Sequence, residues 1–268
     1  MKHFFAITLV LLAISCSSHP EGSIKSLQVS YPQLSDYSEA FEFSYNETGL
    51  LAKVEESYIS EGKKHTFTRI YSYDKLSLSA QVKSTSWGMT RDAQAVFADD
   101  FNHLVSFTIE ADVEEDPETG ICFLGQKWEC SYEDGYLVKS WFYDFTSDGI
   151  DVNLFSWSSE GDLVAYDGSD PGVSVSYRDI VYLDEPNPFK GIDPLALLLG
   201  THSFYWQGLC GARPSKLIHG YPCMTTDNAG EESSSQITFE YQRDDNGRIT
   251  QISRLRDGLP DKTIAIEY

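Results

Sequence analysis

Four cysteines in the body of the chain could form covalent bonds or hold a metal ion: Cys122, Cys130, Cys210 and Cys223. An even number of cysteines favours disulfides when a chain folds in an oxidising compartment. Each cysteine has a near neighbour in sequence, so we expect the local pairs Cys122–Cys130 and Cys210–Cys223, out of three possible connectivities. The alternative is a zinc site that combines Cys210 and Cys223 with His202 and His219, but their spacing matches no standard zinc pattern.

No motif of a known catalytic site is present. The sequence lacks a Gly-x-Ser-x-Gly elbow, a His-Glu-x-x-His helix and a phosphate-binding glycine loop. Carboxylates are abundant, but the runs Glu114–Asp116 and Asp244–Asp245 lie where turns are expected, and solvated charge explains them. We therefore predict no catalytic residue, no metal ligand and no cofactor.

Cys16 has a different environment from the other cysteines. A short basic region with Lys2, the uncharged run Phe4–Ile14 and the small Ser15 precede it. This order is typical of an export signal, and the run is shorter than the ~20 residues of a spanning helix. Ala13-Ile14-Ser15-Cys16 resembles the lipobox of bacterial lipoproteins, although Ala13 stands where that motif usually has Leu. We predict a signal peptide over 1–15, lipid on Cys16, and a membrane anchor and tether over 16–28.

Charge and composition limit the possible partners. The chain has 20 basic and 41 acidic residues and a net charge of −21, which excludes nucleic acid as a partner. Hydrophobic residues make up 41% and aromatic residues 13%, enough for a folded core. No Pro/Ser/Gly-rich linker interrupts the body, so we expect one β domain over 29–268.

One hairpin pattern recurs along the body. In the first copy, apolar and polar residues alternate over Phe41–Tyr45, a turn ends at Gly49, and Leu51 returns to the apolar face. Period-two alternation between Gly-containing turns is typical of β-hairpins. The pattern predicts an all-β fold, a large curved antiparallel meander that forms an open or partly closed barrel-like sheet. The other clear copies have their turn glycine and returning residue at Gly135 and Leu137, Gly161 and Leu163, and Gly247 and Ile249.

One segment predicts a helix instead. Asp193 is a good N-cap, Pro194 suits the first helical position, and Gly200 suits the end of the apolar run between them. So short a helix needs support from packing, and we expect it on the concave side of the sheet.

The segment Asn187–Thr201, followed by Leu209-Cys210-Gly211 and Pro214-Ser215-Lys216, resembles an uncharacterised lipoprotein family of gut-type Bacteroidetes. That family is described as a domain of unknown function with a porin-like fold. The closing hairpin from Phe239 to Thr250 is similar to its final hairpin. The resemblance covers the second half of the chain. It implies an antiparallel, barrel-like sheet around a small helix and implies no reaction.

The functional prediction is a non-enzymatic lipoprotein of the outer membrane, on its periplasmic or cell-surface side, that binds a ligand or an envelope protein. Large aromatic side chains mostly fill the core, but Tyr205 and Trp206 follow the predicted helix and are expected at a ligand-binding mouth. The acidic charge favours a neutral glycan or an apolar ligand. Two alternatives stay open: a hydrolase of envelope glycans or lipids, and a β-barrel that spans the outer membrane.

Overall fold

The computed structural model describes residues 22–34, 36–60, 62–86, 89–109, 125–144, 150–170, 173–199 and 203–268. These residues form one antiparallel sheet of 17 strands and two short helices. None of the helices among them is long and apolar enough to cross a bilayer. The elements are β1 (Ser26–Ser30), β2 (Ser38–Tyr45), β3 (Leu51–Ser60), β4 (Lys63–Asp74), β5 (Ser79–Ser86), β6 (Met89–Phe97), β7 (Leu104–Ile109), β8 (Gln126–Glu133), β9 (Tyr136–Asp144), β10 (Ile150–Trp157), β11 (Leu163–Asp170), β12 (Val173–Tyr177), β13 (Val181–Pro186), α1 (Pro194–Leu198), α2 (Ser203–Trp206), β14 (Lys216–Asp227), β15 (Glu232–Arg243), β16 (Ile249–Arg256) and β17 (Leu259–Glu267).

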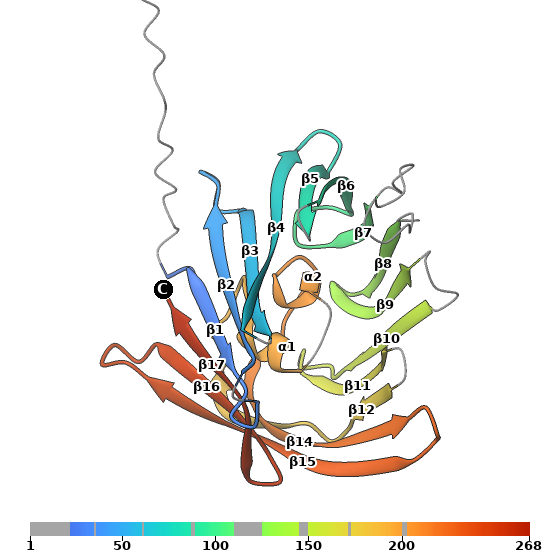
Figure 1. Cartoon of the computed structure of the whole chain (residues 1–268). Helices are drawn as coiled ribbons and strands as arrows, with labels where there is room; N and C mark the ends of the chain where they lie inside the picture. Colours follow the sequence, from blue (N-terminus) through green and yellow to red (C-terminus); the bar gives the residue numbers. More distant parts are fainter. Residues whose placement is uncertain are drawn as a thin grey trace, which may run out of the picture.

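The sheet closes on itself (Figure 1). Strand β1 pairs with β2 on one side and with the last strand, β17, on the other, so that Ser26 lies opposite both Glu42 and Glu267. Consecutive strands pair around the ring, except that β12 pairs with β14, and β13 lies along the first part of β14. The expected all-β antiparallel meander is confirmed, but the sheet is a closed barrel and not an open or partly closed one. Closure pairs the backbone groups that two free sheet edges would leave unpaired.

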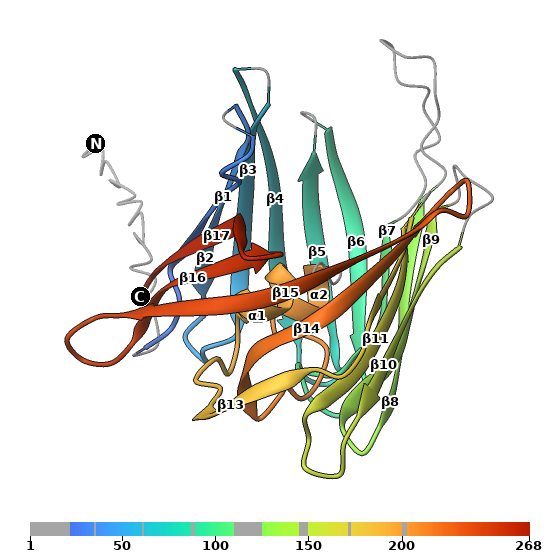
Figure 2. The ribbon, with the colours of Figure 1, turned by 90° about the horizontal axis from the view of Figure 1, so that it is seen from below.

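The two ends of the barrel differ. We call the end with the tight turns at Gly49, Gly135, Gly161 and Gly247 the turn end, and the opposite end, where Tyr31–Tyr37 connect β1 to β2, the far end. The chain enters β1 at the turn end, and β17 finishes there as well. Strand β1 begins at Ser26, within the expected tether. Figure 2 shows the barrel from the side, with the strands running between these two ends.

The recurring hairpins form as the sequence predicts. The four turn glycines have φ between 79° and 83°, the left-handed region that other residues resist. The residues that follow them are buried: Leu51 is 5% exposed, and Leu137, Leu163 and Ile249 are 0% exposed. Short polar side chains open the turns, as in the last copy, where Asp244 accepts hydrogen bonds from the N–H groups of Asn246 and Arg248, both at 2.9 Å.

The helical segment lies inside the barrel (Figure 1). Asp193 caps α1 and accepts hydrogen bonds from the N–H groups of Leu195 at 2.9 Å and Ala196 at 3.4 Å, with Pro194 at the first turn, as predicted. A second helix, α2, was not expected from the sequence. All five residues of α1 are buried, because the closed sheet surrounds them. We call residues 187–199 and 203–215 the plug.

Candidate functional site

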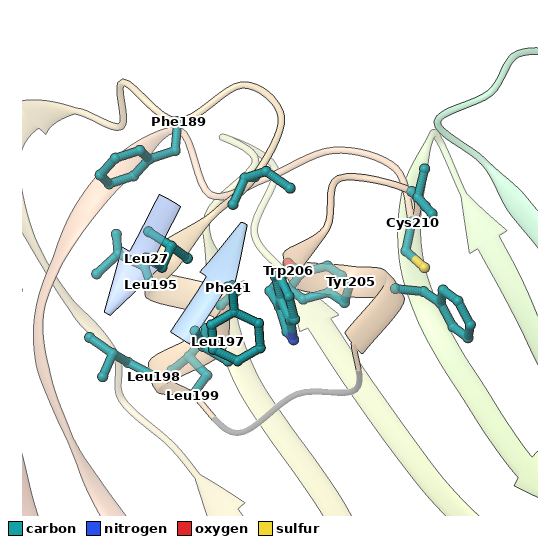
Figure 3. Packing of buried hydrophobic residues seen from close by; sticks show 14 of the residues in the cluster. Leu27, Phe41, Phe189, Leu195, Leu197, Leu198, Leu199, Tyr205, Trp206 and Cys210 are labelled. Carbon is teal, nitrogen blue, oxygen red and sulfur yellow. The ribbon is translucent and has the colours of Figure 1, made fainter. Parts of the chain in front are cut away.

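The plug fills the middle of the barrel with aromatic and aliphatic side chains (Figure 3). Phe204 contacts Phe107 of β7 and Trp128 of β8, with ring centroids 4.5 and 5.4 Å apart. On the opposite wall, Trp206 meets Phe41 of β2 edge to face at 5.0 Å. Tyr205 is 0% exposed and Trp206 3% exposed. The expectation that Tyr205 and Trp206 line a ligand-binding mouth is therefore corrected, because closure of the sheet places both rings in the core.

Hydrogen bonds tie the plug to walls that are far apart in sequence. The Tyr177 hydroxyl on β12 donates to the carbonyl of Leu199 at 2.7 Å, and Arg254 on β16 donates to the carbonyl of Leu198 at 2.6 Å. Tyr71 on β4 donates to the side chain of Gln207 at 3.1 Å. The plug is thus bonded on several sides, and the described part of the lumen is a packed core and not an open channel.

A buried ion pair stabilises the plug from within. The guanidinium of Arg213 lies 3.7 Å from the carboxylate of Asp193, with side chains 8% and 1% exposed. Arg213 also covers the ring of Tyr205, at 4.3 Å from its centroid, and donates to the Tyr205 carbonyl. Burial raises the pKa of Asp193 above its usual range, while the charge of Arg213 and the bonds from the helix N–H groups oppose this shift.

A cavity of about 400 Å³ lies on the far-end side of α1, between the plug and strands β8 to β12. Its lining combines aromatic faces with hydrogen-bonding groups. Trp128 and Phe142 stack at 4.4 Å, and Asn153 accepts a hydrogen bond from the Tyr166 hydroxyl at 2.7 Å, which orients its amide. The volume is that of a small-molecule site. The lining residues are Trp128, Phe142, Asp151, Asn153, Tyr166, Gly168, Ser169, Val175, Tyr177 and Leu199.

The inner wall at β1 to β4 carries tyrosines and carboxyl groups toward the far end. The hydroxyls of Tyr31 and Tyr37 both donate to Glu39, at 2.9 and 2.7 Å. On the neighbouring strand, burial raises the pKa of the Glu56 carboxyl, which the charge of Arg69 opposes and that of Glu39 reinforces. The two acidic groups therefore have different environments on one wall.

The cysteines do not form the expected pair. Cys210 and Cys223 are both free thiols and both buried. Cys223 belongs to β14, where it lies opposite Tyr177 of β12, whereas Cys210 pairs with His103 at the start of β7. The predicted Cys210–Cys223 disulfide is therefore corrected, because the plug carries Cys210 to another wall. Cys16 and Cys122 lie outside the described residues, as does the His202 of the zinc alternative, and His219 is exposed on the outer face.

His103 lies between two carboxylates and a backbone carbonyl group. Its Nδ1 lies 2.9 Å from Asp99 and 3.0 Å from Asp100, and its Nε2 lies 3.3 Å from the carbonyl oxygen of Gly135. Burial alone would lower the pKa of His103, but the bond to Asp100 and the two negative charges outweigh it and raise the pKa. The side chains of Asp99, Asp100 and His103 lie close enough together to hold a metal ion, but both aspartates are exposed. The contacts of His103 also have a structural role, because they link its own turn to the turn at Gly135.

The residues that line the cavity were not predicted from the sequence. Trp128, Phe142, Asn153 and Tyr166 all lie at inward-facing positions of the alternating strands, so their face was predictable. The sequence did not predict which of these side chains lie side by side. Their neighbours depend on how β8, β9, β10 and β11 pair and on the plug, which separates this wall from the opposite one.

Comparison with known proteins shows the fold. No protein-family model matches the sequence, and no curated protein is similar to it. Among solved structures, a porin-like protein from Bacteroides uniformis ATCC 8492 superposes with a TM-score of 0.55 and 14% identity, over 94% of this chain and 98% of that one. A porin-like protein from Bacteroides vulgatus ATCC 8482 has a TM-score of 0.50 and 12% identity, over 91% and 98% of the two chains. The porin-like fold that the family resemblance implied is therefore confirmed, and the chain is a closed, plugged β-barrel of that kind.

Proposed function

We propose that this protein is a lipoprotein of the outer membrane that binds a neutral glycan or a similarly uncharged ring-shaped ligand in the far-end half of its barrel. The observation that carries the proposal is the cavity of about 400 Å³ beside α1, in which the stacked Trp128 and Phe142 lie near the oriented amide of Asn153. Aromatic faces bind the apolar faces of sugar rings, and amide and carboxylate groups bind their hydroxyls.

A lipid anchor on Cys16 would leave this cavity accessible. Chain from Cys16 to Gly22, where the described residues begin, reaches about 20 Å at most when extended. Because Gly22 and Ile24 lie at the turn end, beside Gly49 and Gly247, lipid on Cys16 would hold the turn end near the membrane. The far end and its cavity would then face away from the membrane surface, where a ligand can enter.

The outer face of the barrel favours this arrangement over a membrane-spanning one. The exposed residues that alternate with the core include Glu42, Lys83, Asp92 and Glu240. Lipid-facing positions of spanning barrels are apolar, and a basic side chain at the bilayer midplane costs about 2–4 kcal/mol. The filled lumen likewise argues against a diffusion channel.

Tryptophan emission tests the proposal directly. The full-length protein in detergent should be titrated with neutral oligosaccharides built from glucose, galactose, mannose and N-acetylglucosamine. We expect one class to change the emission of the wild type and to lose most of its affinity with Trp128→Ala. Trp141→Ala is the matched control, because Trp141 lies on the opposite face of β9 from Phe142, under Lys139. Absence of binding by calorimetry, or equal loss in both variants, would contradict the proposal.

A second candidate, hydrolysis of an envelope glycan, rests on one specific observation. Glu56 and Glu39 lie on the same inner wall, and burial raises the pKa of Glu56, as expected for a general acid, while Glu39 accepts two tyrosine hydrogen bonds. If the protein is a hydrolase, Glu56→Gln should abolish release of reducing ends from the bound glycan while its affinity stays unchanged. If the wild type releases none, the binding function stands alone.

A further inference from the structure

Cys210 is held against the barrel wall by backbone hydrogen bonds on both sides. The N–H of Leu104 donates to the carbonyl of Leu209 at 2.8 Å, and the N–H of Gly211 donates to the carbonyl of Asn102. One residue further, the N–H of Ala212 donates to the carbonyl of Gly135 at 3.1 Å. This part of the plug therefore runs beside the start of β7 and the turn from β8 to β9, and Cys210 has little freedom to move.

Cys130 projects from β8 toward the same place. It is 8% exposed, and Cys210 is 0% exposed. Gly211, the residue after Cys210, lies against the ring of Tyr132, because a Cβ at Gly211 would be 3.1 Å from that ring. Tyr132 follows Cys130 by two positions, so both side chains lie on the same inward face of β8. Burial first, and then the neighbouring thiol of Cys130, raise the pKa of Cys210. Tyr132 is itself fixed, because its hydroxyl donates to the carbonyl of Leu104 at 2.8 Å. Thus two free, buried cysteines 80 positions apart in sequence are neighbours at the joint between plug and wall.

We propose that Cys130 and Cys210 form a disulfide when the chain folds in an oxidising compartment, and that this bond fastens the plug to the barrel. The proposal rests on the export inferred above for its natural setting, but the pairing itself follows from the backbone bonds that place Cys210 at the start of β7 and beside β8. It replaces the local pairing expected for Cys210, and it competes with the Cys122–Cys130 pair.

The chemistry requires an oxidant, for which the disulfide of a thiol–disulfide oxidoreductase or of glutathione is sufficient. The thiolate of one cysteine attacks that disulfide, forms a mixed disulfide and releases one thiolate of the oxidant. The second cysteine then attacks the sulfur of the first, forms the Cys130–Cys210 bond and releases the other thiolate. The two cysteine protons pass to the released thiolates, so the oxidant leaves as two thiols. Burial raises the pKa of the Cys210 thiol in the folded barrel, so the exchange should occur before the plug closes.

Peptide mapping decides between the pairings. Trypsin separates the cysteines of the body, because basic residues divide the chain into peptides 92–127, 128–139, 191–216 and 217–243. The full-length chain should be refolded in a glutathione redox buffer, alkylated without reduction and digested. We expect peptide 128–139 linked to 191–216. A link of 128–139 to 92–127, a link of 191–216 to 217–243, or alkylated Cys130 and Cys210 would each overturn the proposal.

Variants connect the bond to the plug. Cys130→Ser should abolish the linked peptide and remove the effect of reductant on the unfolding temperature, whereas Cys223→Ser should keep both the link and a fall in that temperature on reduction. The mapping of the wild type decides the pairing even if Cys130→Ser fails to fold. The same mapping on protein recovered from the cell envelope separates the proposed export from the proposed disulfide. A bond that forms in the redox buffer but is absent in the cell would count against export and leave the pairing intact.

Discussion

The indole N–H of Trp157 donates to the carbonyl oxygen of Leu137, 2.8 Å away. Leu137 returns from the turn at Gly135, and Trp157 ends the incoming strand of the next hairpin. The same bond joins Tyr73 to Leu51 at 2.8 Å and Tyr268 to Ile249 at 3.0 Å. The recurring aromatic residue thus has two roles: its ring fills the core, and its polar atom satisfies a backbone oxygen of the neighbouring hairpin.

Removing this hydrogen bond should lower the stability of the protein even when the packing of the ring is kept. Tyr73→Phe keeps the ring against Phe97 and Phe101 but leaves the Leu51 carbonyl without its donor, which should lower the free energy of unfolding by about 1–2 kcal/mol. Urea unfolding measures it. Tyr143→Phe is the control, because the Tyr143 hydroxyl lies on the solvent-exposed face, and a similar loss there would contradict the interpretation.

Local patterns in the sequence predicted the hairpins well, since alternation and turn glycines act within a few residues. The N-cap of α1 at Asp193 was predictable for the same reason. Closure of the barrel was not, because it depends on the pairing of β1 with β17 at opposite ends of the chain. The position of Cys210 was missed in the same way: sequence proximity suggested Cys223 as its neighbour, whereas the plug carries Cys210 to His103, at the start of β7.

Gly208 of the plug should tolerate an added methyl group less well than Gly247 of the last hairpin turn does. Gly208 has a φ of 84°, and a Cβ there would lie 2.7 Å from the carbonyl oxygen of Gly191, whereas a Cβ at Gly247 would meet nothing within 4 Å. Gly247→Ala should therefore cost only the left-handed backbone strain, about 1 kcal/mol, and Gly208→Ala roughly 2 kcal/mol or more. Urea unfolding of both variants checks the order, and equal costs would show that the plug backbone adjusts freely.

We expect the stability of the protein to depend on pH through His103, at the turn end. Its folded pKa lies above the ordinary value of 6.5, so its stabilising contribution is complete below that pH and is lost as pH rises through the folded pKa. His103→Gln should therefore destabilise the protein more at pH 6 than at pH 8, by less than about 1 kcal/mol. Thermal unfolding at both values measures it, with the exposed His219→Gln as control. A loss that is independent of pH would mean that His103 acts only through its neutral contacts.

We expect the largest loss of stability from disrupting the buried ion pair of Asp193 and Arg213. Arg213→Met leaves the Asp193 carboxylate at the cap of α1 without its cation, and breaking a buried pair from one side costs about 3–5 kcal/mol. Since the folded pKa of Asp193 is raised, its contribution to stability is present below the unfolded pKa and falls as pH rises through the folded pKa. Loss of Arg213 raises that pKa further, so the loss of stability should be larger at pH 7.5 than at pH 4.5, relative to the wild type at each pH.

Asp193→Asn keeps an N-cap oxygen for the N–H groups of Leu195 and Ala196 without a charge. The double variant should therefore recover a large part of the stability at pH 7.5 and show little of this pH dependence. If Arg213→Met is equally destabilising at both pH values and Asp193→Asn rescues nothing, the guanidinium acts by packing on Tyr205 and not by neutralising the cap.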